Sequence, residues 1–270
     1  MNYQEILDGI RRYGSNERDV CIAALGVEPD RIRERVILAP WWEPGVFARL
    51  GLSVTPLDET VQASIRMWEV DWGTCAATYI KTGIGAPKML DVVLALGLTA
   101  CRKAVFIGSV GSLDPVIGIG DLVVPEYSVC GDGASRYLAD GPLDKNDVFG
   151  SRARPDAEVF GRLVDTATRI CAEDKAGCHI GRTFSIDTII AQFAHIEELV
   201  GSGCNTVEME SAVAFRAAEI AGISMGALFS VSDNTVTRKS LLSGRTEEDN
   251  QYRRNVREHL IPQILAEVLA

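Results

Sequence analysis

The sequence has little of what a metal site or a disulfide framework requires. It contains three histidines, and none of them is spaced from a second ligand as zinc sites demand. Its seven cysteines are scattered and include no C-x-x-C pair. We therefore expect neither a metal centre nor a disulfide-stapled fold. Reduced, mostly buried cysteines in a cytoplasmic protein are the favoured interpretation.

Long apolar runs and an excess of positive charge are also missing. No apolar run approaches the ~20 residues of a membrane span, and the polar residues 1–14 lack the apolar core of a signal peptide. The formal net charge of −10 argues against nucleic acid, whose phosphates require a basic face. We expect neither a membrane nor a nucleic-acid partner, although a few local donors can still hold a small anion.

The composition is that of an ordinary soluble protein. Of 270 residues, 47% are hydrophobic and 24% are charged, so the chain is long enough to bury a full core. Apolar strand-like runs alternate with helical spacing, and no repeat, low-complexity segment or linker divides them. This alternation predicts a single α/β domain over residues 1–270, with a mostly parallel or mixed sheet covered by helices.

Short apolar runs that end at turn residues predict the strands, and apolar residues at helical spacing predict the helices. The predicted strands are residues 35–39, 74–82, 103–107, 121–125, 178–186 and 225–231. The predicted helices are one short helix within 1–34, then 89–97, 157–171, a helix from residue 207, and a closing helix to residue 270.

The segments that follow the early strands are candidate ligand contacts. Residues 83–87 (Gly-Ile-Gly-Ala-Pro) form a glycine turn before a helix, the usual place for backbone N–H groups to meet an anion. Residues 108–112 (Gly-Ser-Val-Gly-Ser) are small enough to let a ligand approach a strand's end. The loop 40–45 holds Trp41 and Trp42, which fit either packing or a pocket wall.

Carboxylates in apolar surroundings are the most informative feature. Glu208 and Glu210 flank Met209 before an apolar helix. One interpretation is a helix N-terminus in which both acids favour the macrodipole; the other is a carboxylate that accepts the two hydroxyls of a sugar diol. Asp233, after an apolar strand, is either a cap on the next segment or an acid that delivers a proton to a leaving group.

Residues 207–212 (Val-Glu-Met-Glu-Ser-Ala) resemble the signature of the nucleoside phosphorylase and nucleosidase superfamily. This family includes the hexameric purine nucleoside phosphorylases, the uridine phosphorylases and the methylthioadenosine nucleosidases. The resemblance covers roughly residues 35–260, and the Thr-Gly-Ile-Gly segment and the Asp-Gly-Ala-Ser turn are closest to the uridine phosphorylases. Four further motifs stand in the expected order: Thr82–Pro87, Ile107–Leu113, Gly120–Val124 and Asp132–Ser135.

The resemblance implies a three-layer α/β/α fold around a mixed, barrel-like sheet, and cleavage of a ribosidic C–N bond. It implies that Glu210 binds the ribose 2′- and 3′-hydroxyls and that Met209 packs on the sugar. Ser109 is expected to contact the phosphate or nucleophile near C1′. Val207 and Ile189 are expected to line the base pocket.

The base preference follows from Asp233 in this comparison. Asp233 falls where the purine enzymes keep their general acid, which protonates or hydrogen-bonds the purine N7. Uridine phosphorylases typically lack an acid there. The overall likeness is nearer to the uridine enzymes, but the acid favours a purine base, because its chemistry depends on the leaving group. Cleavage builds positive charge on the sugar and negative charge on the base, and an acid and an anion stabilise both.

The chain departs from the family pattern where phosphate binds. Many phosphorylases place an arginine where this chain has Phe106, and the early loop, usually Gly-Asp-Pro followed by an arginine, is altered over residues 40–44. The base-stacking aromatic of several members is Ile189 here. Residues 63–66 (Ala-Ser-Ile-Arg) resemble the segment that donates an arginine, here Arg66, to a neighbouring subunit. Losing one charge-assisted arginine contact costs about 1.5–3 kcal/mol, or ~10- to 150-fold in affinity.

Three functions stay open from the sequence. The first is a pentosyltransferase that cleaves nucleosides with phosphate, with a leaning toward purines. The second is a nucleosidase that uses water, in which Glu43 lies near the position of the family's glutamate base. The third is a weakly catalytic nucleoside-binding protein. None of these functions needs a metal or organic cofactor. Because family sites borrow a residue across a dimer interface, a homo-oligomer, either a dimer or a hexamer, is expected.

Overall fold

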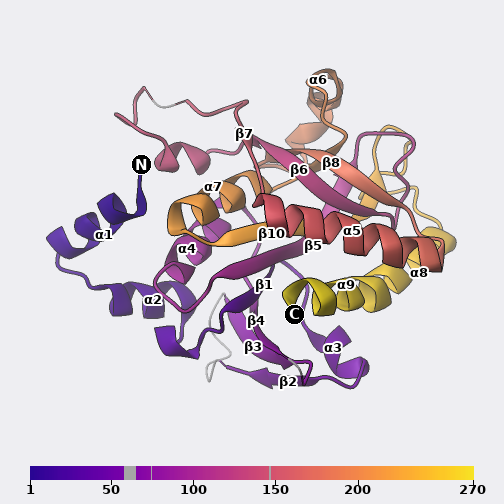
Figure 1. Cartoon of the computed structure of the whole chain (residues 1–270). Coiled ribbons are helices and arrows are strands. Elements are labelled where there is room, and N and C mark those ends of the chain that lie inside the picture. The colour runs from indigo at the N-terminus through magenta and orange to yellow at the C-terminus, as the bar shows by residue number, and fades with distance from the viewer. Residues whose placement is uncertain (58–64, 74, 146) are drawn as a thin grey trace.

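One mixed sheet organises the fold (Figure 1). The structure is a computed structural model that describes residues 1–57, 65–73, 75–145 and 147–270. Over these residues the sheet has ten strands. They are β1 (Arg35–Ala39), β2 (Ser53–Pro56), β3 (Arg66–Asp71), β4 (Ala76–Lys81), β5 (Lys103–Ser112), β6 (Leu122–Gly131), β7 (Arg152–Ala153), β8 (Cys178–Ile186), β9 (Thr206–Glu208) and β10 (Ser224–Asn234).

Five of these strands close into a barrel. Their order is β10–β6–β8–β9–β5, and an additional pairing of β10 with β5 completes the ring. That pairing is parallel and extends from Ser224 opposite Lys103 to Asn234 opposite Ser112. The pairs β10–β6 and β5–β9 are antiparallel, and β1, β4, β3 and β2 continue from β5 as an open flank. The barrel-like mixed sheet that the motifs implied is therefore confirmed.

Helices cover both faces of this sheet (Figure 1). α2, α4 and α7 share one apolar core, whereas α3, α5 and α9 share the core on the opposite face. None of the helices within the described ranges combines the length and apolar character needed to cross a bilayer. The helices are α1 (Tyr3–Arg12), α2 (Glu17–Leu25), α3 (Gly45–Arg49), α4 (Ala86–Leu96), α5 (Ala157–Asp174), α6 (Ile196–Gly201), α7 (Ser211–Ala221), α8 (Glu247–Asn255) and α9 (Ile261–Leu269).

The central strands divide their side chains between the two cores. In β1, Val36 and Leu38 join the core beneath α4 and α7, whereas Ile37 and Ala39 join the core beneath α5 and α9. This division follows from the period of two residues in a strand. Strands buried on both faces have near-continuous apolar sequences, which is why 35–39 could be predicted with the bounds observed. Residues 178–186 were also predicted with the observed bounds, although Ile180 and Arg182 of that strand are exposed. The three-layer α/β/α arrangement is confirmed.

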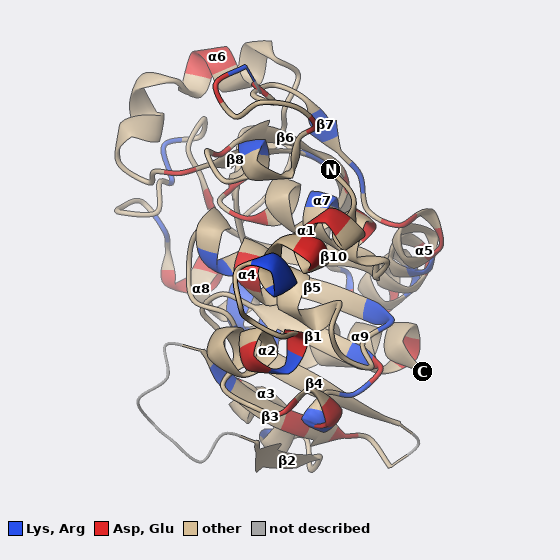
Figure 2. Ribbon diagram, turned by 90° about the vertical axis from the view of Figure 1, so that its left-hand side faces the viewer, with Lys and Arg blue, Asp and Glu red and all other residues tan. Residues whose placement is uncertain are grey.

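The helices carry charged residues of both signs on their solvent-facing sides. Figure 2 shows acidic and basic residues together on α1 and α2. In α1 one acid, Glu5, lies in the first turn and two bases, Arg11 and Arg12, lie in the last, which is the order that the helix dipole favours.

Some predicted boundaries are wrong. Residues 108–112 continue strand β5, which was predicted to end at residue 107, because β10 pairs with β5 along its whole length. Val207 lies in β9, where it pairs with Gly111, so the helix expected from residue 207 begins at Ser211. Strands β2 and β3 were not predicted.

The N-terminal segment holds two helices where one was predicted. The side chain of Asn2 caps α1 and that of Asn16 caps α2. Each side chain accepts a hydrogen bond from a backbone N–H in the first turn of its helix, as helix starts require. The spacing of these two asparagines was the sequence signal for a second helix.

A glycine in β6 provides a test of the barrel's packing. A Cβ on Gly131 would lie 2.0 Å from Cε1 of Phe184 and 2.5 Å from the carbonyl oxygen of Ser185. We expect Gly131→Ala to lower the free energy of unfolding by about 1–3 kcal/mol, as overpacking does. The measurement is the midpoint of urea unfolding.

Gly161 in α5 provides the matched control for this substitution. A Cβ there would meet nothing within 4 Å. We expect Gly161→Ala to raise the free energy of unfolding by about 0.5–1 kcal/mol through helix propensity. Equal unfolding midpoints for the two variants would contradict the close approach of β8 to Gly131.

Candidate active site

A cavity of about 420 Å³ lies at the carboxyl ends of the central strands. This is the edge at which ligands bind in open α/β sheets. It is lined by the ends of β5, β9 and β10 and by the loop that follows β1. Three of its carboxylates are nearly inaccessible to solvent: Glu208 is 7% exposed, Glu210 5% and Asp233 6%.

Glu208 stabilises the turn between β9 and α7. Its carboxylate accepts hydrogen bonds from the backbone N–H groups of Glu210 and Ser211, both 2.7 Å long. It also accepts from the hydroxyls of Ser185 at 2.5 Å and of Ser211 at 2.7 Å. Burial raises the pKa of Glu208, and these hydrogen bonds oppose that rise. With both oxygens engaged, Glu208 has a structural role, as a cap for α7.

Glu210 lies two residues further on and faces the cavity. Its Oε1 accepts a 2.6 Å hydrogen bond from the backbone N–H of Gly85, which precedes α4. Gly85 has φ of +106°, a backbone conformation that side chains with a Cβ rarely adopt. Burial, and then the charge of Glu208, raise the pKa of Glu210 to about 8. Such a carboxylate is short of donors, and a sugar diol provides two.

Asp233 reaches the cavity through an irregularity in β10. The register with β5 shifts between Val231 and Asp233, which places Asp233 opposite Gly111. A Cβ on Gly111 would lie 3.3 Å from Oδ2 of Asp233, so glycine permits this close approach. Burial raises the pKa of Asp233, while a hydrogen bond from Ser232 and the charge of Arg245 act in the opposite direction. A carboxyl group of raised pKa is suited to donate a proton near neutral pH.

The structure brings six of the eight predicted site residues to this cavity. Glu210 and Met209 lie on one part of its wall, and Ser109 and Asp233 come from the parallel pair β5 and β10. Val207 and Ile189 contribute apolar surface. Ser109 is exposed to the cavity, whereas its strand neighbours Gly108 and Val110 are buried.

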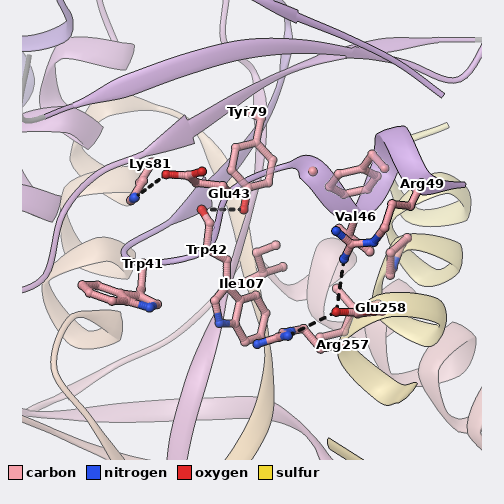
Figure 3. A pocket seen from close by; sticks show the side chains of 14 residues that line it. Trp41, Trp42, Glu43, Val46, Arg49, Tyr79, Lys81, Ile107, Arg257 and Glu258 are labelled. Carbon is pink, nitrogen blue, oxygen red and sulfur yellow. Dashed lines mark hydrogen bonds and ion pairs between the residues drawn. The ribbon is translucent and has the colours of Figure 1, made fainter. Parts of the chain in front are cut away.

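Glu43 and Arg66 are not among the residues that line this cavity. Figure 3 shows Glu43 in a neighbouring cavity of about 470 Å³, where its carboxylate pairs with Lys81 at 2.8 Å. This ion pair lowers the pKa of Glu43. Arg66 begins β3 opposite Lys81, and its guanidinium lies 5.3 Å from the centre of the Trp68 ring. Residues 63 and 64 of the motif that contains Arg66 lie outside the described residues.

Sequence reasoning missed three arginines that line the cavity. Arg245 follows β10 in the chain, Arg253 lies on α8, and Arg257 lies in the π-helical turn Val256–Leu260 that joins α8 to α9. The sequence showed only a charged segment there. The available signal was the spacing of Arg253 and Arg257, because residues four apart share one face of a helix.

Gln192 is a further cavity residue that the sequence did not single out. It lies in the short helical turn Ala191–Ala194 and is 9% exposed. Its amide offers both a donor and an acceptor at the part of the cavity that Ile189 also lines. A nucleobase edge presents the same two kinds of group.

Known proteins resemble this chain in sequence. A family model described as the phosphorylase superfamily matches residues 42–270. The uridine phosphorylase of Escherichia coli is 29% identical over 182 residues, which cover 62% of this chain and 67% of that protein. The uridine phosphorylase of Thermococcus kodakarensis is 26% identical over 181 residues, which cover 62% of this chain and 61% of the relative.

The fold has a counterpart among solved structures. The crystal structure of a uridine phosphorylase from Vibrio fischeri superposes with a TM-score of 0.71 at 20% identity, covering 88% of this chain and 92% of that one. The family model spans most of the chain and includes β5, β9 and β10, whose ends line the cavity. The resemblance carried by the sequence motifs is confirmed, and the chain belongs to the phosphorylase superfamily.

Proposed function

We propose that this protein cleaves the N-ribosidic bond of a nucleoside with inorganic phosphate, giving the free base and ribose 1-phosphate. The observation that carries the proposal is the convergence of Glu210, Asp233 and Ser109 on one cavity. These residues offer a carboxylate for the sugar diol, a proton donor for the base and a hydroxyl for the phosphate. No cofactor enters the proposed reaction.

The proposed reaction is a displacement at C1′. An oxygen of HPO₄²⁻ forms a bond to C1′ as the C1′–N bond breaks, and the electron pair of that bond passes to the base. Asp233, in its acid form, donates a proton to N7 of a purine. The proton that phosphate loses on forming the ester restores the acid. Charge develops on the sugar and the base only in the transition state, where the fixed carboxylates act.

Phosphate is favoured over water as the nucleophile by the charges around Ser109. Its hydroxyl accepts a 2.9 Å hydrogen bond from Arg253, so a cation borders the position of the nucleophile. Hydrolysis needs a general base to activate water. Glu43, the residue considered for that role, is engaged with Lys81 in the neighbouring cavity (Figure 3).

A purine base is proposed because Asp233 faces the cavity and burial raises its pKa. Uridine is the second candidate base, because the relatives described above are named uridine phosphorylases. Gln192 provides a donor and an acceptor that suit either base. The two candidates differ in whether catalysis depends on the acid at residue 233.

We also propose a homo-oligomer in which Arg66 serves a neighbouring subunit. Arg66 is not part of the cavity wall in its own chain. It begins a strand of the open flank of the sheet, away from the closed barrel. An arginine there can reach a second subunit that packs against this flank.

Asp233→Asn tests the proposed acid. Asparagine keeps the shape of the side chain but has no acidic proton. With inosine and saturating phosphate we expect kcat to fall about 10²-fold or more, the usual contribution of general acid catalysis, and KM for inosine to change little. Steady-state kinetics on inosine, adenosine, guanosine, uridine and methylthioadenosine provide the measurement.

Uridine is the internal control for Asp233→Asn. Uracil has no N7, so a smaller loss of uridine cleavage is expected. An inosine kcat equal to that of the wild type would show that Asp233 is not the acid. Cleavage of uridine alone by the wild type would make uridine the substrate.

Glu210→Gln tests the proposed sugar contact and its pH dependence together. Above pH 8, where the carboxyl group is ionised, we expect kcat/KM to fall about 10- to 150-fold, because a hydrogen bond to a charged group is lost. The folded-state pKa of about 8 exceeds the ordinary value of 4.5. Between these pH values the unfolded chain releases a proton that the folded chain retains, so this carboxyl group lowers stability as pH rises.

The stability of the Glu210→Gln variant is therefore expected to exceed that of the wild type by an amount that grows from pH 5 to pH 8. Melting temperatures across this range provide the measurement. Glu219→Gln, on the exposed part of α7, is the matched control and should give no such trend. A constant difference between Glu210→Gln and wild type would contradict the raised pKa.

A further inference from the structure

The phosphate group required by the proposed function needs positive charge beside Ser109. Strand β5 supplies none of it: Phe106 packs edge-on against Phe229 with ring centres 4.9 Å apart, inside the apolar core. Lys81 lies in the neighbouring cavity and pairs with Glu43. The cations that line the cavity itself come from the C-terminal part of the chain.

Arg253 is the cation in direct contact with Ser109. Its Nη2 donates a 2.9 Å hydrogen bond to the Ser109 hydroxyl. Its Nε is buried and finds no hydrogen-bond partner among the described residues. A buried N–H group without a partner is costly, so this arginine is arranged for an acceptor that the protein itself does not provide.

The charge of Arg253 is also less neutralised by nearby carboxylates than the charge of Arg257. Arg257 is 3.3 Å from Glu258, which also pairs with Arg49 at 3.1 Å (Figure 3). Arg253 has no carboxylate within ion-pair distance over the described part of the chain. Burial, and then Arg257 and Arg245, lower the pKa of Arg253 to about 10. A bound dianion would offset both the burial and the repulsion between these cations.

Helix α8 is held in place at its start and at the residue before Arg253. The preceding residue, Tyr252, donates a 3.0 Å hydrogen bond to Asp121 and accepts one of 2.9 Å from the N–H of Gly177. At the start of the helix, Thr246 and Asp249 form a capping box, and Lys239 binds Asp249 at 3.0 Å. The guanidinium is therefore preorganised, which lowers the entropic cost of binding an anion.

We propose that Arg253 is the principal phosphate ligand of this protein, provided by the C-terminal helix of the same chain, with Arg257 as a second cation. This inference rests on the proposed phosphorolysis, and it goes further by naming residues outside the recognised motifs. The π-helical turn Val256–Leu260 separates Arg257 from the regular helix that carries Arg253. Irregular turns of this kind are frequent at functional sites.

The test compares Arg253→Gln with Arg254→Gln. Both variants remove one positive charge from α8, but Arg254 is exposed and does not line the cavity. We expect Arg253→Gln to raise KM for phosphate about 10- to 150-fold at saturating nucleoside, with KM for the nucleoside within about twofold of wild type. Arg253→Lys is expected to recover part of the loss, because it keeps the charge but not the two-pronged geometry. Arg254→Gln should match the wild type.

A second measurement is independent of turnover. Inorganic phosphate should raise the melting temperature of the wild type and of Arg254→Gln, because a ligand that binds only the folded state stabilises it. The shift should be lost in Arg253→Gln. Equal phosphate KM values and equal shifts for the two glutamine variants would overturn the assignment of Arg253.

The two proposals can fail separately. A wild type that cleaves no nucleoside but loses its phosphate-induced shift on Arg253→Gln would refute phosphorolysis and support Arg253 as an anion ligand. Phosphate-dependent cleavage that Arg253→Gln leaves unchanged would support phosphorolysis and refute the role of Arg253. A wild type without a phosphate-induced shift or phosphate-dependent turnover would refute both.

Discussion

The buried carboxylate of Glu208 is the interaction on which the site depends. Two backbone N–H groups and two hydroxyls converge on it from β8 and from the first turn of α7. Ser211, one of these donors, also contacts Ser128 on β6 at 2.6 Å, so the network joins the barrel wall to the helix. A buried charge is tolerated only when it is satisfied in this way. Because Glu208 fixes the turn, the next residues, Met209 and Glu210, project into the cavity.

The other charged residues of the site, Glu210, Asp233 and Arg253, are held by different elements of the fold. Glu210 is held by Gly85 after β4, whereas Asp233 lies at the end of β10. Arg253 lies on α8, the helix that follows β10, and its side chain reaches Ser109 on β5. In surroundings of low dielectric these charges act strongly on one another and on a ligand. The raised pKa values of Glu210 and Asp233 and the lowered pKa of Arg253 share one main cause, burial at this edge of the sheet.

Local sequence predicted the parts of this arrangement that depend on local pattern. Strand 35–39 is a short apolar run, and the motif around Glu210 and the acid at Asp233 stand out in apolar surroundings. Local pattern gave the wrong strand boundary where pairing with a distant strand determines the structure. The small residues 108–112 were predicted to follow a strand that ends at residue 107, yet pairing with β10 extends β5 to Ser112. A glycine is needed at position 111 because the side chains of Val207 and Asp233 approach it closely. Both residues are distant from Gly111 in the sequence, so local pattern does not reveal this need.

The contact between Arg253 and Ser109 also could not be predicted from local sequence. Ser109 and Arg253 are 144 residues apart, and the sequence between them gives no sign that they meet. Their contact depends on Tyr252, which ties α8 to Asp121 at the start of β6 and to Gly177 before β8. The ring of Tyr252 in turn packs where Gly120 has no Cβ. An arginine on an exposed helix would be an ordinary surface charge. Fixed by these contacts against the open end of the barrel, Arg253 instead becomes a half-buried cation that faces the position where phosphate is proposed to bind.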